Sequence, residues 1–575
     1  MIVTIILVNH SQRAQTMNFF CSKDCPDLCG MDIHSEENMI SYRAEPQPWS
    51  SPGFICSKFK DFATREINNG LRSWQKTGDD IQHFPDTADG LGALAKWLAP
   101  YRNKNILYLR GSGSLGYNMG YWDQLFAAFP HCVTVNSDPC NATGGKAHRL
   151  DFGCVSNPCV THLAEAETII LYGKNAAVTS PHLYSYLKKL KKSGSEIILI
   201  DPVRTATVSL ADYFIQIQPA CDGLLACALL TELGHERDYP IPQLLETAGV
   251  AHEDFALLLD RLRHKKVAHI QGMGLQRQEN GMNAMRWINR LVHFTAGEER
   301  LYYGHKSKRR WQPHPVRFSK ELSLDEITVR LAAGEFDLFV NIAVNPVVTY
   351  ADSNLWIRAL NRTPTLVVDT NMTTTATYAD FFLKVGGMFA QADFQGSYFF
   401  PHHYSRPALT DELSDMQAAH ALAKKLNIPL IRTPEENLRA PAPAPRKYQT
   451  QSLDLHWPQE MKDFRLLTAS HLDYLNSQIM NGQEEGLQVI HINPLDAEQK
   501  EIASGDHLRV EGDCGAFSAQ ALITDEVRAG TLMCWKNLPM LDGFCNSAVP
   551  GRLTDGETGL AYYAAEVRIF KINGG

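Results

Sequence analysis

The stretch "TIILYGKNAAVTSPHLYSYLKKLKKSG" (168–194) begins as an apolar run, passes through a Gly-Lys-Asn turn and continues as an amphipathic helix. Strand–turn–helix units of this kind build doubly wound parallel sheets. In such sheets ligands lie beyond the carboxyl ends of the strands, where glycine lets the backbone approach a phosphate and helix N-termini hold it. The stretch therefore predicts an α/β fold with a ligand site at the glycine turn.

Similar units recur along the middle of the chain. They lie at 105–118, 195–219, 267–297, 336–360 and 363–385. None of their turns is a complete G-x-G-x-x-G motif, so each one alone is equally an ordinary tight turn.

Two pairs of these segments resemble each other. Residues 172–189 and 342–360 both contain a strand, an Asn, a Val-Thr step and a helix. Residues 200–217 and 368–385 both contain a strand, an Asp, a Thr/Ala stretch and Ala-Asp before an apolar run. Internal repetition is stronger evidence than any single turn. It predicts two pseudo-equivalent halves, and hence two similar nucleotide-bearing ligands.

A cysteine cluster precedes these units. "CSKDCPDLCG" (21–30) contains Cys21, Cys25 and Cys29, and Cys56 follows at a distance. Four-cysteine zinc sites usually come as two close pairs, whereas three grouped thiolates plus a remote one are typical of a [4Fe–4S] cluster. The spacing favours iron–sulfur over zinc, and buried structural cysteines are a third reading.

Length and composition limit the other possibilities. A chain of 575 residues and 64.4 kDa should form several domains. The net charge of −8 argues against a nucleic-acid partner. No apolar run is long enough for a membrane span, and "MIVTIILV" lacks the flanks of an export signal. We expect a cytoplasmic protein, with translation starting at Met1 or Met17. Thirteen irregularly spaced cysteines do not suggest a disulfide framework.

The C-terminal part has a different pattern. Residues 432–454 are rich in Pro, Ala and charge and predict an extended linker. The short strand-like segments that follow predict a β-barrel domain.

In these features the chain resembles the DMSO reductase superfamily, whose members bind molybdenum or tungsten through two pyranopterin guanine dinucleotides. The matching stretches are "CSKDCPDLCG", "GFICSK", "GSGSLGYN", "CNATGGKAHRLDFG", "IILYGKNAAVTSPH", "ILIDPVRTATVSLADYFIQIQPACDG", "GMGLQRQENG", "NPVVT", "TTTATYADFFL", "LLTASHLDYLNSQ" and "INPLDAEQKEIASGDHLRVEGDCGAF". They occur in family order over nearly the whole chain.

The resemblance implies a multidomain α/β fold with two doubly wound dinucleotide-binding domains and a six-stranded double-psi-type barrel. The predicted parts are a [4Fe–4S] domain (17–75), a discontinuous dinucleotide-binding domain (76–138 and 336–431), a second one (139–335), the linker (432–454) and the barrel (455–575).

The resemblance also implies roles for individual residues. The predicted cluster ligands are Cys21, Cys25, Cys29 and Cys56, with Lys58 between the cluster and one pterin. The predicted cofactor-binding residues are Gly111, Gly113, Gly173, Asn175, Asp201, Arg204, Asp222, Gly272, Gly274, Asn345, Asp369, Thr468, Asn476, Ser477 and Gln478.

Cys140 falls where family members place the protein ligand to the metal, and a thiolate suits molybdenum or tungsten. A small buried cysteine is the alternative, and we expect Cys132, Cys154 and Cys159 to be structural. Formate dehydrogenases of the superfamily place His after this ligand, so Asn141 argues against formate. His148 is either a proton donor or a core or solvated histidine.

The implied function is a two-electron oxidoreduction or oxygen-atom transfer on a small substrate. Electrons would pass through the cluster to a ferredoxin-like or flavin subunit. Two alternatives stay open. One is a non-redox tungsten hydratase, which in this superfamily uses an Asp beside a cluster cysteine, although a surface or capping role is favoured for Asp24 and Asp27. The other is an electron-transfer subunit without the metal, as in respiratory complex I.

Overall fold

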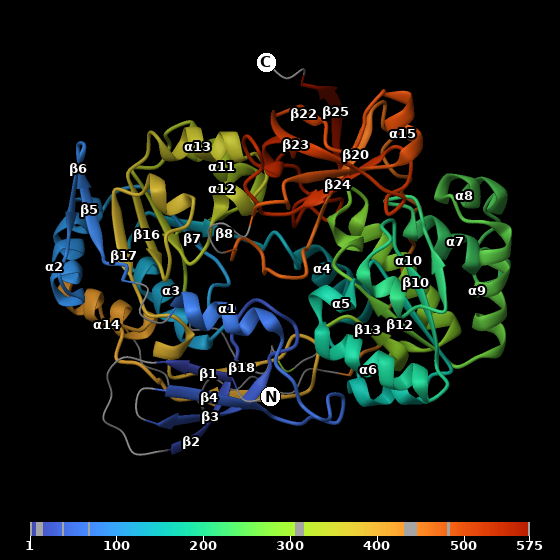
Figure 1. The fold of residues 1–575 in the computed structure, drawn as a ribbon, viewed down its shortest axis with the longest axis horizontal. Helices are drawn as coiled ribbons and strands as arrows, with labels where there is room; N and C mark the ends of the chain where they lie inside the picture. Colours follow the sequence, from blue (N-terminus) through green and yellow to red (C-terminus); the bar gives the residue numbers. More distant parts are fainter. Residues whose placement is uncertain are drawn as a thin grey trace.

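The computed structural model describes residues 3–6, 15–36, 39–66, 70–304, 307, 316–430, 445–479 and 484–572. Figure 1 shows two α/β units side by side, a barrel above the space between them and a small antiparallel sheet on the opposite side. Within these ranges no helix has the length and apolar character needed to cross a membrane.

The small sheet carries the cysteine cluster. Its strands are β1 (Val3–Ile6), β2 (Gln15–Phe20), β3 (Gly30–Glu36) and β4 (Met39–Ala44), in the antiparallel order β1-β4-β3-β2. Cys21, Cys25 and Cys29 lie in the β2–β3 connection, and Cys56 directly precedes helix α1 (Ser57–Glu66). Strand β1 precedes Met17 and pairs with β4, so the sheet extends beyond the predicted start of this domain.

One α/β unit contains a fully parallel sheet with the order β11-β10-β9-β12-β13. Its strands are β9 (Thr168–Tyr172), β10 (Glu196–Ile200), β11 (Tyr213–Ile215), β12 (Val267–Gln271) and β13 (Leu301–Tyr302). Its helices are α4 (Ala142–Phe152), α5 (Ala176–Thr179), α6 (Pro181–Lys192), α7 (Asp222–Glu232), α8 (Ile241–Ala248), α9 (His252–His264) and α10 (Gly281–Thr295).

The other unit contains an eight-stranded sheet with the order β14-β8-β7-β15-β16-β17-β5-β6. Its strands are β5 (Trp74–Thr77), β6 (Asp80–His83), β7 (Ile106–Arg110), β8 (Cys132–Val135), β14 (Lys320–Leu322), β15 (Leu338–Ile342), β16 (Thr365–Asp369) and β17 (Phe381–Lys384). Its helices are α2 (Thr87–Leu98), α3 (Gly120–Ala127), α11 (Leu324–Ala332), α12 (Pro346–Thr349), α13 (Ser353–Leu360) and α14 (Asp415–Lys425). A hairpin of β18 (Asp393–Gly396) and β19 (His403–Arg406) follows β17.

The two sheets share a five-stranded topology. The order β11-β10-β9-β12-β13 corresponds to β17-β16-β15-β7-β8. In the first unit the two extra strands follow the repeated segments in sequence, and in the second unit they precede them. The repeated segments recognised in the sequence therefore occupy equivalent places in two similar sheets.

Strand burial explains the continuous apolar runs. In β7, Ile106 and Tyr108 pack on one face of the sheet while Leu107 and Leu109 pack on the other. Strands covered on both faces by helices are apolar throughout rather than alternating. The core on the Leu107 side continues into the barrel, which is thereby fixed to this unit.

The C-terminal domain is a closed barrel with the order β20-β24-β21-β23-β22-β25. Its elements are β20 (Phe464–Ala469), β21 (Val489–Ile492), α15 (Pro494–Gln499), β22 (His507–Gly512), β23 (Gly515–Ile523), β24 (Thr531–Trp535) and β25 (Ala565–Lys571). The predicted α/β fold with a six-stranded C-terminal barrel is confirmed.

The predicted domain boundaries stay a prediction, and two strands cross them. Strand β14 lies within 139–335 but pairs with β8 of the eight-stranded sheet. Strand β5 starts at Trp74, inside the predicted cluster domain, and pairs with β17. Much of the predicted linker lies outside the described residues. Its remainder packs along the first unit, where Arg286 donates to Gln451 and Asn283 to the carbonyl of Asp454.

Candidate functional site

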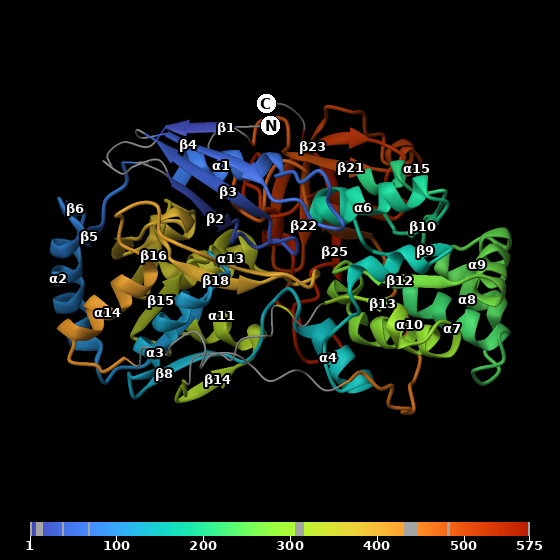
Figure 2. The same ribbon diagram turned by 90° about the horizontal axis from the view of Figure 1, so that it is seen from below.

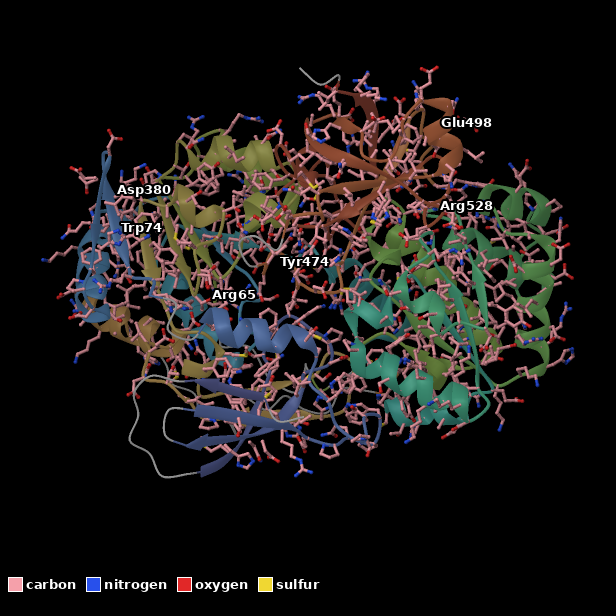
Figure 3. All side chains as sticks on the ribbon, viewed as in Figure 1. Arg65, Trp74, Asp380, Tyr474, Glu498 and Arg528 are labelled. Atoms are coloured by element: carbon pink, nitrogen blue, oxygen red, sulfur yellow. The ribbon has the colours of Figure 1, made fainter. Side chains whose placement is uncertain are left out.

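A cavity of about 1020 Å³ lies where the two α/β units, the barrel and the cysteine loop meet. Figure 2 shows the same four parts from below, and in Figure 3 Tyr474 of the cavity wall is labelled near the centre of the molecule. Binding pockets for drug-sized ligands occupy roughly 300–1,000 Å³, so this one is large.

Most of the predicted site residues contribute to its wall. They are Lys58, Gly111, Gly113, Cys140, Gly173, Asn175, Asp201, Asp222, Gly274, Asn345, Thr468, Asn476, Ser477 and Gln478.

Three predicted cofactor residues lie behind the wall. Gly272 packs against the carbonyl of Gly173. The Arg204 guanidinium lies 4.9 Å from the ring centroid of Phe214. The Asp369 carboxylate accepts the backbone N–H groups of the next two residues. These three residues could act on a dinucleotide only through the residues that line the cavity, or after a rearrangement when the cofactor binds.

His148 also lies outside the cavity wall. Its Nε2 is 2.8 Å from Gln271 Oε1, and its ring stacks on Tyr303 at 4.5 Å. Gln271 and Tyr303 themselves line the cavity. The structure thus places His148 one residue away from the cavity, in a buried polar network, and its role as proton donor stays a prediction.

The glycine turns of the two halves are built alike. A Cβ on Gly272 would overlap the carbonyl oxygen of Gly173, and a Cβ on Gly111 would lie 2.5 Å from the carbonyl oxygen of Ala343. Gly173 and Ala343 both have left-handed backbones, with φ of 53° and 50°. Each half therefore brings two strand ends closer together than side chains would permit, which leaves backbone groups accessible to a ligand.

Two buried carboxylates line the cavity on the side of the five-stranded sheet. Burial raises the pKa values of Asp201 and Asp222 to about 7. Among the described residues Asp222 Oδ1 has no hydrogen-bond partner. An unsatisfied buried acceptor is costly unless a ligand donates to it. The N–H groups of a guanine base or the hydroxyls of a ribose would fit this requirement.

Cys140 lies on the wall just before helix α4. Asp138 Oδ1 accepts the backbone N–H groups of Cys140 at 3.0 Å and of Asn141, and thereby orders the turn before the helix. Burial raises the pKa of the Cys140 thiol, and the positive charge of Arg277 opposes this shift. A neighbouring cation favours the thiolate that a metal would require.

Sequence reasoning missed several charged residues of the wall. Lys536 Nζ donates to Asn476 Oδ1 at 2.9 Å, and Asn476 Nδ2 donates to Asp24 Oδ2 at 3.1 Å. Burial and the charge of Arg277 lower the pKa of Lys536 to about 8. Asp24, for which a surface or capping role was favoured, lines the cavity. Arg277 occurs within a glycine-rich stretch singled out in the sequence, and that position was the available signal.

The four predicted cluster cysteines come together beside the cavity. Burial and the neighbouring Cys56 raise the pKa of Cys21 to about 12. The pKa values of Cys25 and Cys29 are raised as well, first by burial and then by the negative charges of Asp27 and Cys56. Thiols that lose water and interact electrostatically with one another would fit a shared metal group, which would hold them as thiolates. Across the described ranges, no three His, Cys, Asp or Glu side chains converge closely enough to hold a single ion.

Two lysines of the cavity wall lie near these cysteines. Lys58 Nζ donates to the carbonyl of Val178 at 3.2 Å. Lys174, inside the Gly-Lys-Asn turn, is 5.7 Å from the ring centroid of Phe399. Burial lowers the pKa of Lys174, whereas Asp27 and Cys25 favour its charged form. Lys174 was not predicted, although it lies between two residues that were.

A solved structure shares this architecture. Acetylene hydratase from Pelobacter acetylenicus matches with a TM-score of 0.74 at 15% identity, over 97% of this chain and 100% of that one. The two proteins therefore share one fold over nearly their whole lengths.

Sequence comparisons give the family. The family model "Molybdopterin oxidoreductase" matches residues 110–383, and "Molydopterin dinucleotide binding domain" matches 464–562. The chain belongs to the molybdopterin oxidoreductases and is an enzyme.

Two relatives come from Bacillus subtilis (strain 168). The probable oxidoreductase YyaE is 23% identical over 67% of this chain, and the match spans 64% of YyaE, slightly less than two thirds. The probable oxidoreductase YoaE is 22% identical over 96% of this chain and 98% of its own length.

Proposed function

We propose that this enzyme catalyses a two-electron oxidation or reduction, or an oxygen-atom transfer, on a small substrate at a molybdenum or tungsten centre. The observation that carries the proposal is one cavity whose wall combines the glycine turns of two similar sheets with Cys140. Lys58 and Lys174 of this wall interact electrostatically with Cys56 and Cys25, respectively.

Different residues of the cavity wall have different proposed roles. Gly111, Gly173 and Asp222 would hold the two guanine dinucleotides at the strand ends, and the loop 468–478 would close over the pterins from the barrel. Cys140 would be the protein ligand to the metal. When bound, the pterin–metal group supplies the redox chemistry, while the protein binds and orients the reactants.

Electrons would leave or enter through a [4Fe–4S] cluster on Cys21, Cys25, Cys29 and Cys56. Lys58 would lie between this cluster and one pterin. The sequence contains one cluster motif, so a ferredoxin-like or flavin protein is the proposed electron partner.

A second candidate is the addition of water to a substrate without net redox change. It is favoured by Asp24, which neighbours Cys25 and faces the cavity, where Asn476 fixes its carboxylate. The protein of similar fold is named a hydratase. A metal-free electron-transfer subunit is less well supported, because Cys140 lies at the cavity wall.

Elemental analysis of anaerobically purified protein tests the proposal. We expect about four Fe and about one Mo or W per chain. Zinc without iron would contradict the cluster assignment, and iron without Mo or W, from a host that makes the pterin, would favour an electron-transfer subunit. Turnover of a substrate panel with and without a one-electron donor or acceptor then separates the candidates, because an oxidation requires an acceptor, a reduction requires a donor, and only the hydratase works without either.

A further inference from the structure

His182 contacts one of the predicted cluster cysteines from the neighbouring domain. Its Nε2 lies 3.3 Å from Cys29 Sγ, and the side chains are nearly inaccessible, with 5% and 7% exposure. His182 is the second residue of helix α6, 153 positions from Cys29 in sequence. The contact therefore depends on how the dinucleotide-binding unit packs on the cysteine loop.

The imidazole is held independently of Cys29. Asp27 Oδ2 accepts the backbone N–H of His182 at 2.9 Å, and Asp27 Oδ1 accepts the hydroxyl of Ser180. On the other side the ring of Phe54 stacks on the imidazole at 4.3 Å. Asp27 comes from the loop of three cysteines and Phe54 from the segment of the fourth. Both cysteine segments thus fix the ring against Cys29 Sγ.

The direction of this hydrogen bond follows from the chemistry of a bound thiolate. A cysteine that ligates iron has lost its proton and can only accept, so Nε2 must carry the hydrogen. Hydrogen bonds to cluster sulfurs are among the factors that set the reduction potential. Because an N–H donor stabilises the more negatively charged reduced cluster more than the oxidised one, it raises that potential.

We propose that His182 is a positioning residue that donates a hydrogen bond to Cys29 Sγ and raises the reduction potential of the cluster. This inference rests on the proposed function, since it requires a [4Fe–4S] cluster on the four cysteines. The step concerned is the uptake of one electron by the cluster from the electron partner. No bond is formed or broken, and the imidazole keeps its proton.

The test is an EPR-monitored redox titration of anaerobically purified holoenzyme. His182→Leu removes the hydrogen-bond donor but keeps a side chain of similar size. His182→Gln keeps an N–H donor on a side chain of similar length. We expect a lower midpoint potential in His182→Leu, partial recovery in His182→Gln, and about four Fe in all proteins. Equal midpoint potentials in the wild type and His182→Leu, with full iron, would overturn the inference.

His402 supplies a matched control. Its Nε2 lies 3.0 and 2.9 Å from the carbonyl oxygens of Asp27 and Leu28, so it supports the same loop through the backbone. We expect His402→Leu to leave the midpoint potential near that of the wild type. A downward shift as large as that of His182→Leu would attribute the effect to loosening of the loop and would also overturn the inference.

A measurement on the wild type covers the case in which His182→Leu does not fold. With ¹⁵N-labelled histidine, pulsed EPR of the reduced cluster should show a weak nitrogen coupling that is altered in His182→Gln. No histidine coupling would contradict the hydrogen bond. If the wild-type protein contained no iron, the proposed cluster itself would be contradicted. If it contained the cluster but showed no histidine coupling, only the role of His182 would be contradicted.

Discussion

Asn175 and Asn345 make the same hydrogen bonds in the two halves of the molecule. Thr207 Oγ1 donates to Asn175 Oδ1 at 2.9 Å, and Thr375 Oγ1 donates to Asn345 Oδ1 at 2.8 Å. The backbone carbonyl of each Asn accepts the hydroxyl of the Thr four residues later, Thr179 or Thr349, at 2.8 Å in both halves. The repeated sequence segments thus encode a repeated hydrogen-bond network behind each ligand-facing turn.

We expect Asn175→Ala and Asn345→Ala each to destabilise the turn of one half and to reduce dinucleotide binding there. Each substitution leaves a threonine hydroxyl without its buried acceptor, at a cost of about 1–3 kcal/mol in the free energy of unfolding. Guanine nucleotide released from purified holoenzyme should fall from about two per chain towards one, if each turn holds one dinucleotide. Asn361→Ala, at the exposed end of α13, is the control and should change neither quantity. Full nucleotide content in both variants would contradict this assignment.

Cys140→Ala tests the metal ligand. We expect activity to fall by more than about 100-fold, beyond the effect typical of an outer-shell partner, and the metal absorption or EPR spectrum to change. Cys159→Ala is the control, because the Cys159 sulfur accepts the hydroxyl of nearby Thr161 and does not line the cavity, and it should keep both activity and spectrum. Full activity with an unchanged spectrum in Cys140→Ala would remove the ligand assignment.

The buried carboxylates predict a pH dependence of stability for the cofactor-free chain. The pKa of Asp222 rises to about 7 from its ordinary value of 3.8, so the folded state binds more protons between these values. The free energy of unfolding should therefore fall as pH rises from 4 to 7, by up to about 1.4 kcal/mol per pH unit for this group. Asp222→Asn should reduce the slope and increase stability at pH 8, measured by urea unfolding.

Asp513→Asn is the control for this pH series, because Asp513 is exposed and its substitution should leave the slope unchanged. If Asp222→Asn shows the same slope as the parent chain, Asp222 does not titrate as its burial indicates.

Gly111→Ala should disturb the turn that receives a ligand in the second unit. Its Cβ would lie 2.5 Å from the carbonyl oxygen of Ala343 and 2.6 Å from Val344 Cβ. Overpacking at such a contact costs about 1–3 kcal/mol, and we expect a lower melting temperature and less bound cofactor. Gly92→Ala in helix α2 meets no atom closer than 4.0 Å and should stabilise slightly. Equal melting temperatures for the two variants would show that the turn tolerates a side chain.

Much of the architecture could be predicted from the sequence. The paired segments 172–189 and 342–360 indicated two similar halves, and the short C-terminal strands indicated the barrel. These features are local, since periodicity and turn residues act over a few positions. Glycines 111, 113 and 173 were found for the same reason, because a turn that needs a left-handed or crowded backbone is marked by the residue itself.

Other parts of the site could not be found in this way. Lys536 was not predicted, and its hydrogen bond to Asn476, as well as that of Asn476 to Asp24, joins segments 60 and 452 positions apart. His148 follows the Cys140 loop in sequence, but in helix α4 its side chain lies behind Gln271 of the cavity wall and is not itself part of that wall. Position along the chain does not specify the direction of a side chain in the folded protein.

The sequence by itself determined the strand–turn–helix units, their repetition, the cysteine spacing and the barrel strands, because these depend on neighbouring residues. Only the tertiary structure decided that β7 and β8 take the places of β12 and β13, although they lie on opposite sides of the repeats in sequence. It also decided that His182 meets Cys29 and that Arg277 and Lys536 face Cys140. The physical reason is that these contacts form between segments that are distant in sequence, and the local sequence of either segment does not specify its partner.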